Sequence, residues 1–251
     1  MFDLTGRIAV VTGAGRGLGA AMARALAKAG AEVILVGRTR APLEEMAAAI
    51  RHDNGRAGVA TCDISSSEDI AAMVSGIYAR HSRIDILINN AGIQSRAPLP
   101  EVAKTTWDAM IETHLTGPFM TCQAVLPGMF AQGSGKIINT VSVLGELGRP
   151  LVVPYAAAKG GLRMLTRGLA TEVARRNIQV NAIGPGYFLT EINRDIMDDR
   201  AYFDRVVERV PAGRWGDPAD IGGTAVFLAS RASDYVSGQI IYVDGGLTAS
   251  F

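Results

Sequence analysis

The feature that most constrains the fold of this chain is a regular alternation of short apolar runs with longer, helix-prone stretches. The runs are nearly continuous in Val, Ile and Leu, which is typical of parallel strands buried on both faces by helices. Right-handed crossovers between such strands build a doubly wound sheet that binds ligands at the carboxyl ends of its strands. We therefore predict a single α/β domain over residues 1–251, with a seven-stranded parallel sheet and helices on both faces. The predicted strands are residues 7–12, 32–37, 57–62, 84–89, 135–142, 178–183 and 239–243.

The stretch of residues 187–214 departs from this alternation, because it is charged and helix-prone and follows the sixth predicted strand. Long connections in compact domains usually carry function or are disordered, so we interpret this insertion as a substrate lid. A plain surface insertion is the alternative. The predicted helices of the regular pattern are residues 18–29, 42–51, 66–78, 105–130, 154–176 and 217–229.

Charge and cysteine content exclude several classes of protein. Lys and Arg number 25 and Asp and Glu 24, and this near-balance gives no support for nucleic acid or an anionic membrane as the main partner, since both favour clustered positive charge. Two cysteines, Cys62 and Cys122, are too few for a disulfide framework or a zinc site, and we expect both to be buried apolar residues. The N-terminal residues do not resemble a signal peptide, and no apolar run approaches the ~18 residues of a membrane span. We expect a cytoplasmic protein with no metal.

A glycine-rich turn follows the first predicted strand. The 29 glycines among 251 residues already indicate tight turns and close backbone approaches. Residues 12–19 read T-G-x-x-x-G-x-G, and the next predicted helix begins within them. Such a turn brings backbone N–H groups to a pyrophosphate at the N-terminus of the helix, although a tight turn that binds nothing is the alternative. The residues predicted to contact the cofactor here are Gly13, Gly15, Arg16, Gly17, Leu18 and Gly19.

The end of the second predicted strand indicates which nucleotide binds. An NAD site needs Asp or Glu there for the ribose hydroxyls, but this chain has Arg38 and no acid. Arg38 and Arg16 suit a 2′-phosphate, so we predict NADP rather than NAD, with solvated surface charges as the alternative. Asp63, after the third strand, is a candidate acceptor for the adenine amino group or else a helix cap.

Tyr155 and Lys159 lie four residues apart, on one face of a predicted helix, and Ser142 ends the fifth strand. Tyrosine has a pKa near 10, and lowering it by about three units requires roughly 4 kcal/mol. One ammonium about 4 Å away supplies roughly that much at an effective dielectric of about 20. Tyr155 would then take the proton of a substrate alcohol that Ser142 holds, while Lys159 also anchors the cofactor ribose. Without the glycine-rich turn, a packing pair would be the better interpretation.

Together these motifs resemble the short-chain dehydrogenase/reductase superfamily over essentially the whole chain. The resemblance rests on residues 12–19, 62–63, 89–92, 142, 155–159, 180–186 and 243–246. It implies a Rossmann fold, a nicotinamide cofactor, a Ser-Tyr-Lys mechanism and a homotetramer built on two long helices and the last strand. It also implies further residues along the cofactor cleft, namely Asn90, Ala91, Gly92, Pro185, Gly186 and Thr190.

One position departs from the family pattern. The family usually has Asn in an N-L-x-G helix motif, where it joins a proton relay to the lysine, but this chain has His114. Histidine also donates and accepts hydrogen bonds and ordinarily titrates near neutrality. His114 either relays protons, or is a structural substitute held by backbone carbonyls, or weakens turnover.

Within the superfamily the chain most resembles the gluconate 5-dehydrogenases, which interconvert D-gluconate and 5-keto-D-gluconate with NADP. Residues 91–96, 155–161, 184–187 and 240–246 carry this resemblance. A sugar acid needs a cation for its carboxylate and polar groups for its hydroxyls, and planar Arg suits carboxylates. The candidate substrate residues are Arg96, Glu146, Arg149, Tyr187 and Asn193. The alternatives are a 3-oxoacyl-acyl-carrier-protein reductase and a nucleotide-binding regulator with weak turnover.

Overall fold

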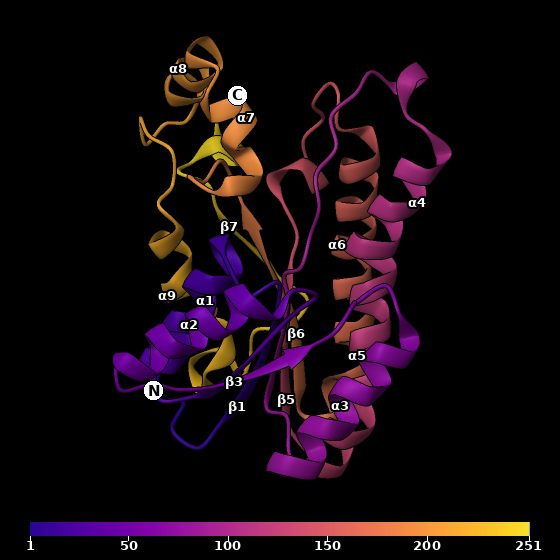
Figure 1. The fold of residues 1–251 in the computed structure, drawn as a ribbon, viewed down its shortest axis with the longest axis vertical. Helices are drawn as coiled ribbons and strands as arrows, with labels where there is room; N and C mark the ends of the chain where they lie inside the picture. Colours follow the sequence, from indigo (N-terminus) through magenta and orange to yellow (C-terminus); the bar gives the residue numbers. More distant parts are fainter. Residues whose placement is uncertain (251) are drawn as a thin grey trace.

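Seven parallel strands form one sheet in the order β3-β2-β1-β4-β5-β6-β7 (Figure 1). The structure is a computed structural model, and it describes residues 1–250. The strands are β1 (Ile8–Thr12), β2 (Glu32–Gly37), β3 (Arg56–Thr61), β4 (Ile86–Asn89), β5 (Gly135–Thr140), β6 (Ile178–Pro185) and β7 (Ile240–Val243). The predicted doubly wound fold is confirmed. The strand order reverses between β1 and β4, and in such sheets the crevice at this reversal binds the ligand.

Helices cover both faces of the sheet (Figure 1). One face is covered by α1 (Gly17–Lys28), α2 (Arg40–His52) and α9 (Gly222–Ala229). The other face is covered by α3 (Ser67–His81), α5 (Gly117–Gln132) and α6 (Val153–Val173). Each layer buries an apolar core against the strands, in which Met22 and Leu26 of α1 and Val125 and Met129 of α5 are fully buried. The inner strands of the sheet are therefore desolvated on both sides, as their apolar sequence predicts, whereas the edge strands β3 and β7 are only partly buried.

The predicted long helix over residues 105–130 is interrupted. The chain forms α4 (Lys104–Ile111), then the π-helical turn η2 (Glu112–Thr116), and then α5. A π-helical turn inserts an extra residue into the helix and is frequent at functional sites. Here the widened turn carries His114, whose imidazole is buried and contacts the backbone of Ile93 in the loop after β4.

Residues 187–214, the predicted lid segment, form α7 (Arg194–Met197) and α8 (Arg200–Arg209) at one end of the molecule (Figure 1). The segment forms a small apolar cluster together with neighbouring loops, separate from the two main cores. In this cluster, Ile196 and Val206 of the segment are buried beside Val143 and Leu247. Trp215, just past the segment, stacks on Phe203 with ring centroids 5.2 Å apart. The segment is therefore packed onto the loops at the carboxyl ends of the strands.

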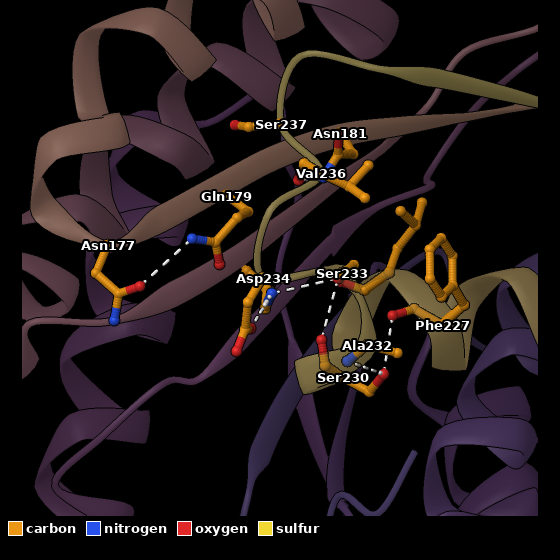
Figure 2. Close-up of polar contacts among 12 residues, drawn as sticks. Asn177, Gln179, Asn181, Phe227, Ser230, Ala232, Ser233, Asp234, Val236 and Ser237 are labelled. Atoms are coloured by element: carbon orange, nitrogen blue, oxygen red, sulfur yellow. Dashed lines mark hydrogen bonds and ion pairs between the residues drawn. The ribbon is translucent and has the colours of Figure 1, made fainter. Parts of the chain in front are cut away.

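Polar side chains fix the turn between α9 and β7 against β6 (Figure 2). The Asn181 side chain donates to the Val236 carbonyl at 2.7 Å and accepts from the Gln239 N–H at 3.0 Å. Ser233 donates to the carbonyl of Ser230 at 3.0 Å. These bonds place the last strand beside β6. Among residues 1–250, no helix is long and apolar enough to cross a membrane.

Candidate active site

A cavity of about 900 Å³ opens where the carboxyl ends of the strands meet the lid segment. Its volume is at the upper end for ligand sites in proteins. Most of the residues predicted to act on cofactor or substrate line it. They are Gly13, Gly15, Arg16, Gly17, Leu18, Arg38, Asp63, Asn90, Ala91, Gly92, His114, Ser142, Arg149, Tyr155, Lys159, Pro185, Gly186, Tyr187, Thr190 and Asn193. Three predicted residues are not in this lining: Gly19, Arg96 and Glu146.

The glycine-rich turn is held tightly against the loop after β4. Gly13 and Gly17 have φ angles of +64° and +57°, which glycine adopts without strain. A Cβ at Gly19 would lie 2.2 Å from the Gly13 carbonyl oxygen, so Gly19 is required by packing rather than by contact with the cavity. Asn90 donates through Nδ2 to the carbonyls of Thr12 and Gly13 at 3.0 and 3.3 Å. Asn90 thus lines the cavity and also pins the turn.

The N-terminus of α1 faces this cavity with its backbone N–H groups unused by a side-chain cap, because its N-cap Arg16 makes no such bond. This is the arrangement that binds phosphate groups. Arg38 lines the cavity from the end of β2. Hydrogen bonds from Ser65 and, less strongly, the charge of Arg38 lower the pKa of Asp63. Glycines, two guanidinium groups and a carboxylate at these places fit a dinucleotide that carries a 2′-phosphate.

Tyr155 and Lys159 lie one turn apart near the start of α6, where Pro154 occupies the first turn. The Lys159 Nζ lies 5.6 Å from the centroid of the Tyr155 ring and donates to the Thr140 carbonyl oxygen at 2.6 Å. Ser142, two residues beyond Thr140, accepts from the Leu144 N–H at 3.1 Å. Burial lowers the pKa of Lys159 from 10.5 to about 7. Ser142, Tyr155 and Lys159, three of the four predicted catalytic residues, thus all line the cavity, and the fourth, His114, lines it too.

The electrostatic expectation for Tyr155 is wrong for the protein without cofactor. Burial, the largest influence, raises the pKa of Tyr155 above its ordinary value of 10.0, and hydrogen bonding to Ser142 and the charge of Arg96 only partly oppose it. Lys159 is itself buried, and its ammonium is bonded to a backbone carbonyl. A single lysine thus does not outweigh the desolvation of the phenolate.

His114 is held by the backbone. Its Nε2 lies 2.8 Å from the carbonyl oxygen of Ile93 and 3.2 Å from the Ile93 nitrogen. Its ring meets the Tyr155 ring edge-on, with centroids 5.0 Å apart. Burial, and then the charge of Lys159, lower the pKa of His114 from 6.5 to about 3. The imidazole is therefore neutral at physiological pH, which favours the structural interpretation over a relay that titrates near neutrality.

Comparisons with known proteins show which family has this fold. A family model described as enoyl-(acyl carrier protein) reductase matches residues 13–248. The chain belongs to the short-chain dehydrogenase/reductase superfamily. It is 43% identical to gluconate 5-dehydrogenase of Gluconobacter oxydans, over 100% of this chain and 98% of that protein. It is 44% identical to 2-dehydro-3-deoxy-D-gluconate 5-dehydrogenase of Formosa agariphila, over 100% and 96%. A solved gluconate 5-dehydrogenase of Burkholderia cenocepacia, in complex with NADP and tartrate, is 46% identical with a TM-score of 0.97, over 100% and 98%.

In this short-chain dehydrogenase/reductase, three of the predicted substrate residues line the cavity, on the side of the lid segment. The guanidinium of Arg149 lies over the rings of Tyr187 and Tyr202, at 5.9 and 5.1 Å from their centroids. The two phenol oxygens are 3.2 Å apart. Asn193 donates through Nδ2 to the carbonyl of Phe188 at 3.1 Å. Arg149 is thus held by aromatic rings with its charge available to the cavity.

The other two predicted substrate residues are engaged outside the lining. Arg96 pairs with Asp195 and donates to the Asn193 side chain at 3.3 Å, so it ties the loop after β4 to the lid segment. Glu146 accepts from the Tyr242 hydroxyl at 2.6 Å and pairs with Arg163 at 3.0 Å. Glu146 therefore joins the loop after β5 to β7 and α6 rather than pointing to the cavity.

Several residues that line the cavity of this superfamily member were missed from the sequence, and two of them, Gln94 and Thr140, carry polar groups that bear on the site. The Gln94 side chain lines the cavity, and its Oε1 is buried without a hydrogen-bond partner among the residues described. Gln94 lies two residues beyond Gly92, which was itself predicted to line the cofactor cleft, and this position could have indicated that Gln94 also lines the cavity. Thr140 acts through its backbone carbonyl, which side-chain patterns do not reveal. Within residues 1–250, no group of three or more His, Cys, Asp and Glu side chains is arranged to hold a metal ion.

Proposed function

We propose that this enzyme moves a hydride between NADP and a secondary alcohol or ketone of a sugar acid, with D-gluconate and 5-keto-D-gluconate as the substrate pair. The observation that carries the proposal is the single cavity lined by Tyr155, Lys159 and Arg149. The first two suit proton exchange at an alcohol, and the third suits a carboxylate. The relatives named above act on sugar acids of this kind by their names. A hydrophobic acyl chain would leave the charge of Arg149 unpaired.

NADP, when bound, supplies or accepts the hydride. The N-terminus of α1 and the glycine-rich turn would hold the pyrophosphate, because their N–H groups face the cavity. Arg16 and Arg38 would hold the 2′-phosphate, and Asp63 the adenine amino group. Arg16 pairs with Glu191 at 2.9 Å, but both side chains are largely exposed, so this pair is weak and exchanges its partner readily. The nicotinamide end would lie along Asn90, Ala91, Gly92, Pro185, Gly186 and Thr190.

Tyr155 takes the hydroxyl proton of the alcohol during oxidation and returns it to the ketone oxygen during reduction. Ser142 holds the same oxygen by a hydrogen bond. Lys159, fixed by Thr140, has a pKa near 7 and so is only partly charged at neutrality. Burial raises the pKa of Tyr155, and hydrogen bonding to Ser142 and the charge of Arg96 oppose this only in part. The phenolate would therefore also need the charge of the Lys159 ammonium.

The lid segment, residues 187–214, closes the substrate end of the cavity in this proposal. Two ion pairs support that role, since Arg96 pairs with Asp195 and Arg16 pairs with Glu191, and so two different loops are each tied to the lid segment. Tyr187 and Asn193 of the segment line the cavity and would contact substrate hydroxyls.

A homotetramer and a cytoplasmic location complete the proposal. Large apolar side chains on α5 and α6 are exposed, with Phe119 at 47% and Met164 at 60% of their free area. Exposed apolar groups on helices of a folded chain favour contact with another copy.

The test is a spectrophotometric assay of purified protein with NADP or NAD against gluconate, other aldonates, simple secondary alcohols and a 3-oxoacyl thioester. We expect NADP-dependent turnover of an aldonate, and at least a hundred-fold loss in Tyr155→Phe, in line with the removal of a general acid–base group. Turnover of the thioester alone, or full activity in Tyr155→Phe, would contradict the proposal.

A further inference from the structure

We propose that Gln94 recognises a substrate hydroxyl next to the reacting carbon, and that His114 positions it by gripping the backbone of Ile93. The inference rests on the proposed function, because only a polyhydroxylated substrate offers such a hydroxyl. It assigns a specificity-determining role to Gln94 and a positioning role to the residue that replaces the usual Asn of the family.

The first observation is the unsatisfied carboxamide. Gln94 lines the cavity that also contains Tyr155 and Ser142. Its Oε1 is buried, and no residue between 1 and 250 donates a hydrogen bond to it. Buried acceptors in folded proteins are almost always paired, and an unpaired one beside a cavity needs an explanation. A hydroxyl both donates and accepts, as a carboxamide does, so a rotation of the side chain that turned this oxygen toward the cavity would pair it with a sugar-acid hydroxyl.

The second observation is that His114 holds the backbone of Ile93, the residue next to Gln94. The His114 Nε2 contacts both the carbonyl oxygen and the nitrogen of Ile93, which directly precedes Gln94. The imidazole is 2% exposed and is held so closely that a Cβ on Gly92 would lie 2.6 Å from its Cε1. The backbone that carries Gln94 is therefore fixed from two neighbouring positions.

The third observation joins this loop to the reacting centre. The ring of His114 packs edge-on against Tyr155, with the centroids 5.0 Å apart. One side chain thus contacts both the catalytic phenol and the loop that presents Gln94. In this proposal, His114 therefore couples the position of the phenol that exchanges the proton to the position of the backbone that carries Gln94. Misplacement by about 1 Å at such a site costs on the order of a hundred-fold in rate.

Gln94→Leu tests the recognition, because leucine has a similar size and no hydrogen-bonding group. We expect kcat/KM for the aldonate to fall about 10- to 100-fold, at least ten times more than for a simple secondary alcohol, since a site built for a hydroxyl loses an unreplaced hydrogen bond. Ser95→Ala is the matched control, because Ser95 is the next residue and is not among those that line the cavity. Calorimetric titration of the enzyme–NADP complex with D-gluconate provides a readout without turnover and should show the same weakening.

His114→Phe and His114→Asn test the positioning. Phenylalanine keeps the ring against Tyr155 but cannot bond to Ile93, so it should lower aldonate selectivity as Gln94→Leu does. The double variant with Gln94→Leu should lose no further selectivity, because the two residues act on one contact. His114→Asn, whose side chain retains a donor and an acceptor, should keep more of the aldonate selectivity than His114→Phe does.

The outcomes separate the two proposals. A wild-type enzyme that turns over no sugar acid overturns the proposed function, and with it the inference. A wild-type enzyme that does, with Gln94→Leu losing equally on both alcohols or on neither, overturns the inference alone. Equal thermal stability of the variants shows that the comparison is made between folded proteins.

Discussion

The side-chain nitrogen of Lys159 lies 2.6 Å from the carbonyl oxygen of Thr140, the last residue of β5. This bond ties α6 directly to the sheet, two residues before Ser142. The lysine is therefore fixed by the backbone before any ligand arrives, at the cost of burying its ammonium. The consequences of that burial are measurable.

Lys159→Met should stabilise the protein most at low pH. Burial lowers the pKa of Lys159 from 10.5 to about 7, so between those values the unfolded chain binds more protons than the folded one. The free energy of unfolding of the wild type therefore rises with pH in that window, by at most about 1.4 kcal/mol per pH unit. Denaturant unfolding from pH 6 to 9 should show a variant–wild-type gap that is largest at pH 6 and shrinks as pH rises. Lys28→Met, at an exposed lysine of α1, is the control, and a pH-independent gap would contradict the burial argument.

Arg38→Ala should weaken NADP binding selectively. A charge-assisted hydrogen bond contributes about 1.5–3 kcal/mol, so the Kd for NADP should rise roughly 10- to 100-fold while the Kd for NAD changes little. Quenching or enhancement of NADPH and NADH fluorescence measures both. Arg40→Ala is the matched control, because Arg40 is exposed and pairs with Glu44 on α2. Equal weakening of both nucleotides would show that Arg38 does not contact the 2′-phosphate.

His114→Asn should leave the positions of the limbs of the pH–rate profile unchanged. With a pKa near 3, the imidazole stays neutral across pH 5–10 and adds no limb of its own. We expect kcat to fall by less than about ten-fold, since the backbone contact is only partly lost. The measurement is kcat/KM as a function of pH for the wild type and for His114→Asn. A limb that is present in the wild type and missing in the variant would assign His114 a titrating role.

Phe119→Glu and Met164→Glu should each shift the protein to a smaller assembly. Their side chains are exposed on α5 and α6, and a carboxylate there would have to be desolvated in a contact between copies. Size-exclusion chromatography with light scattering reports the mass. Phe2→Glu, at another exposed aromatic residue, controls for the change in surface character. An unchanged mass in both helix variants would place the interface elsewhere.

The sequence was sufficient wherever a local pattern decides the structure. The run at residues 32–37 coincides with β2, and Ser66 caps α3 by accepting from the Asp69 N–H at 3.1 Å. Spacing alone placed Tyr155 and Lys159 on one face of α6. Periodicity and capping act within a few residues, so they can be read from the chain.

The parts of the site that the sequence did not predict depend on contacts between residues that are distant in sequence. Arg96 was predicted to face substrate, but it is paired with Asp195, 99 positions away. Glu146 is bonded to Tyr242, 96 positions away. Neither pairing leaves a local signal. The π-helical turn at His114 coincides with a contact to Ile93, 21 positions away, and the helical pattern of the sequence does not reveal either.

The cavity collects residues from Gly13 to Arg194. A chain synthesised from its N-terminus therefore completes the nucleotide-holding turn long before Tyr155 emerges from the ribosome. A fragment that ends before residue 155 lacks the phenol that exchanges the proton, so it cannot consume reduced nucleotide. Because the last residue that lines the cavity is Arg194, the capacity for hydride transfer arises only in the last third of translation.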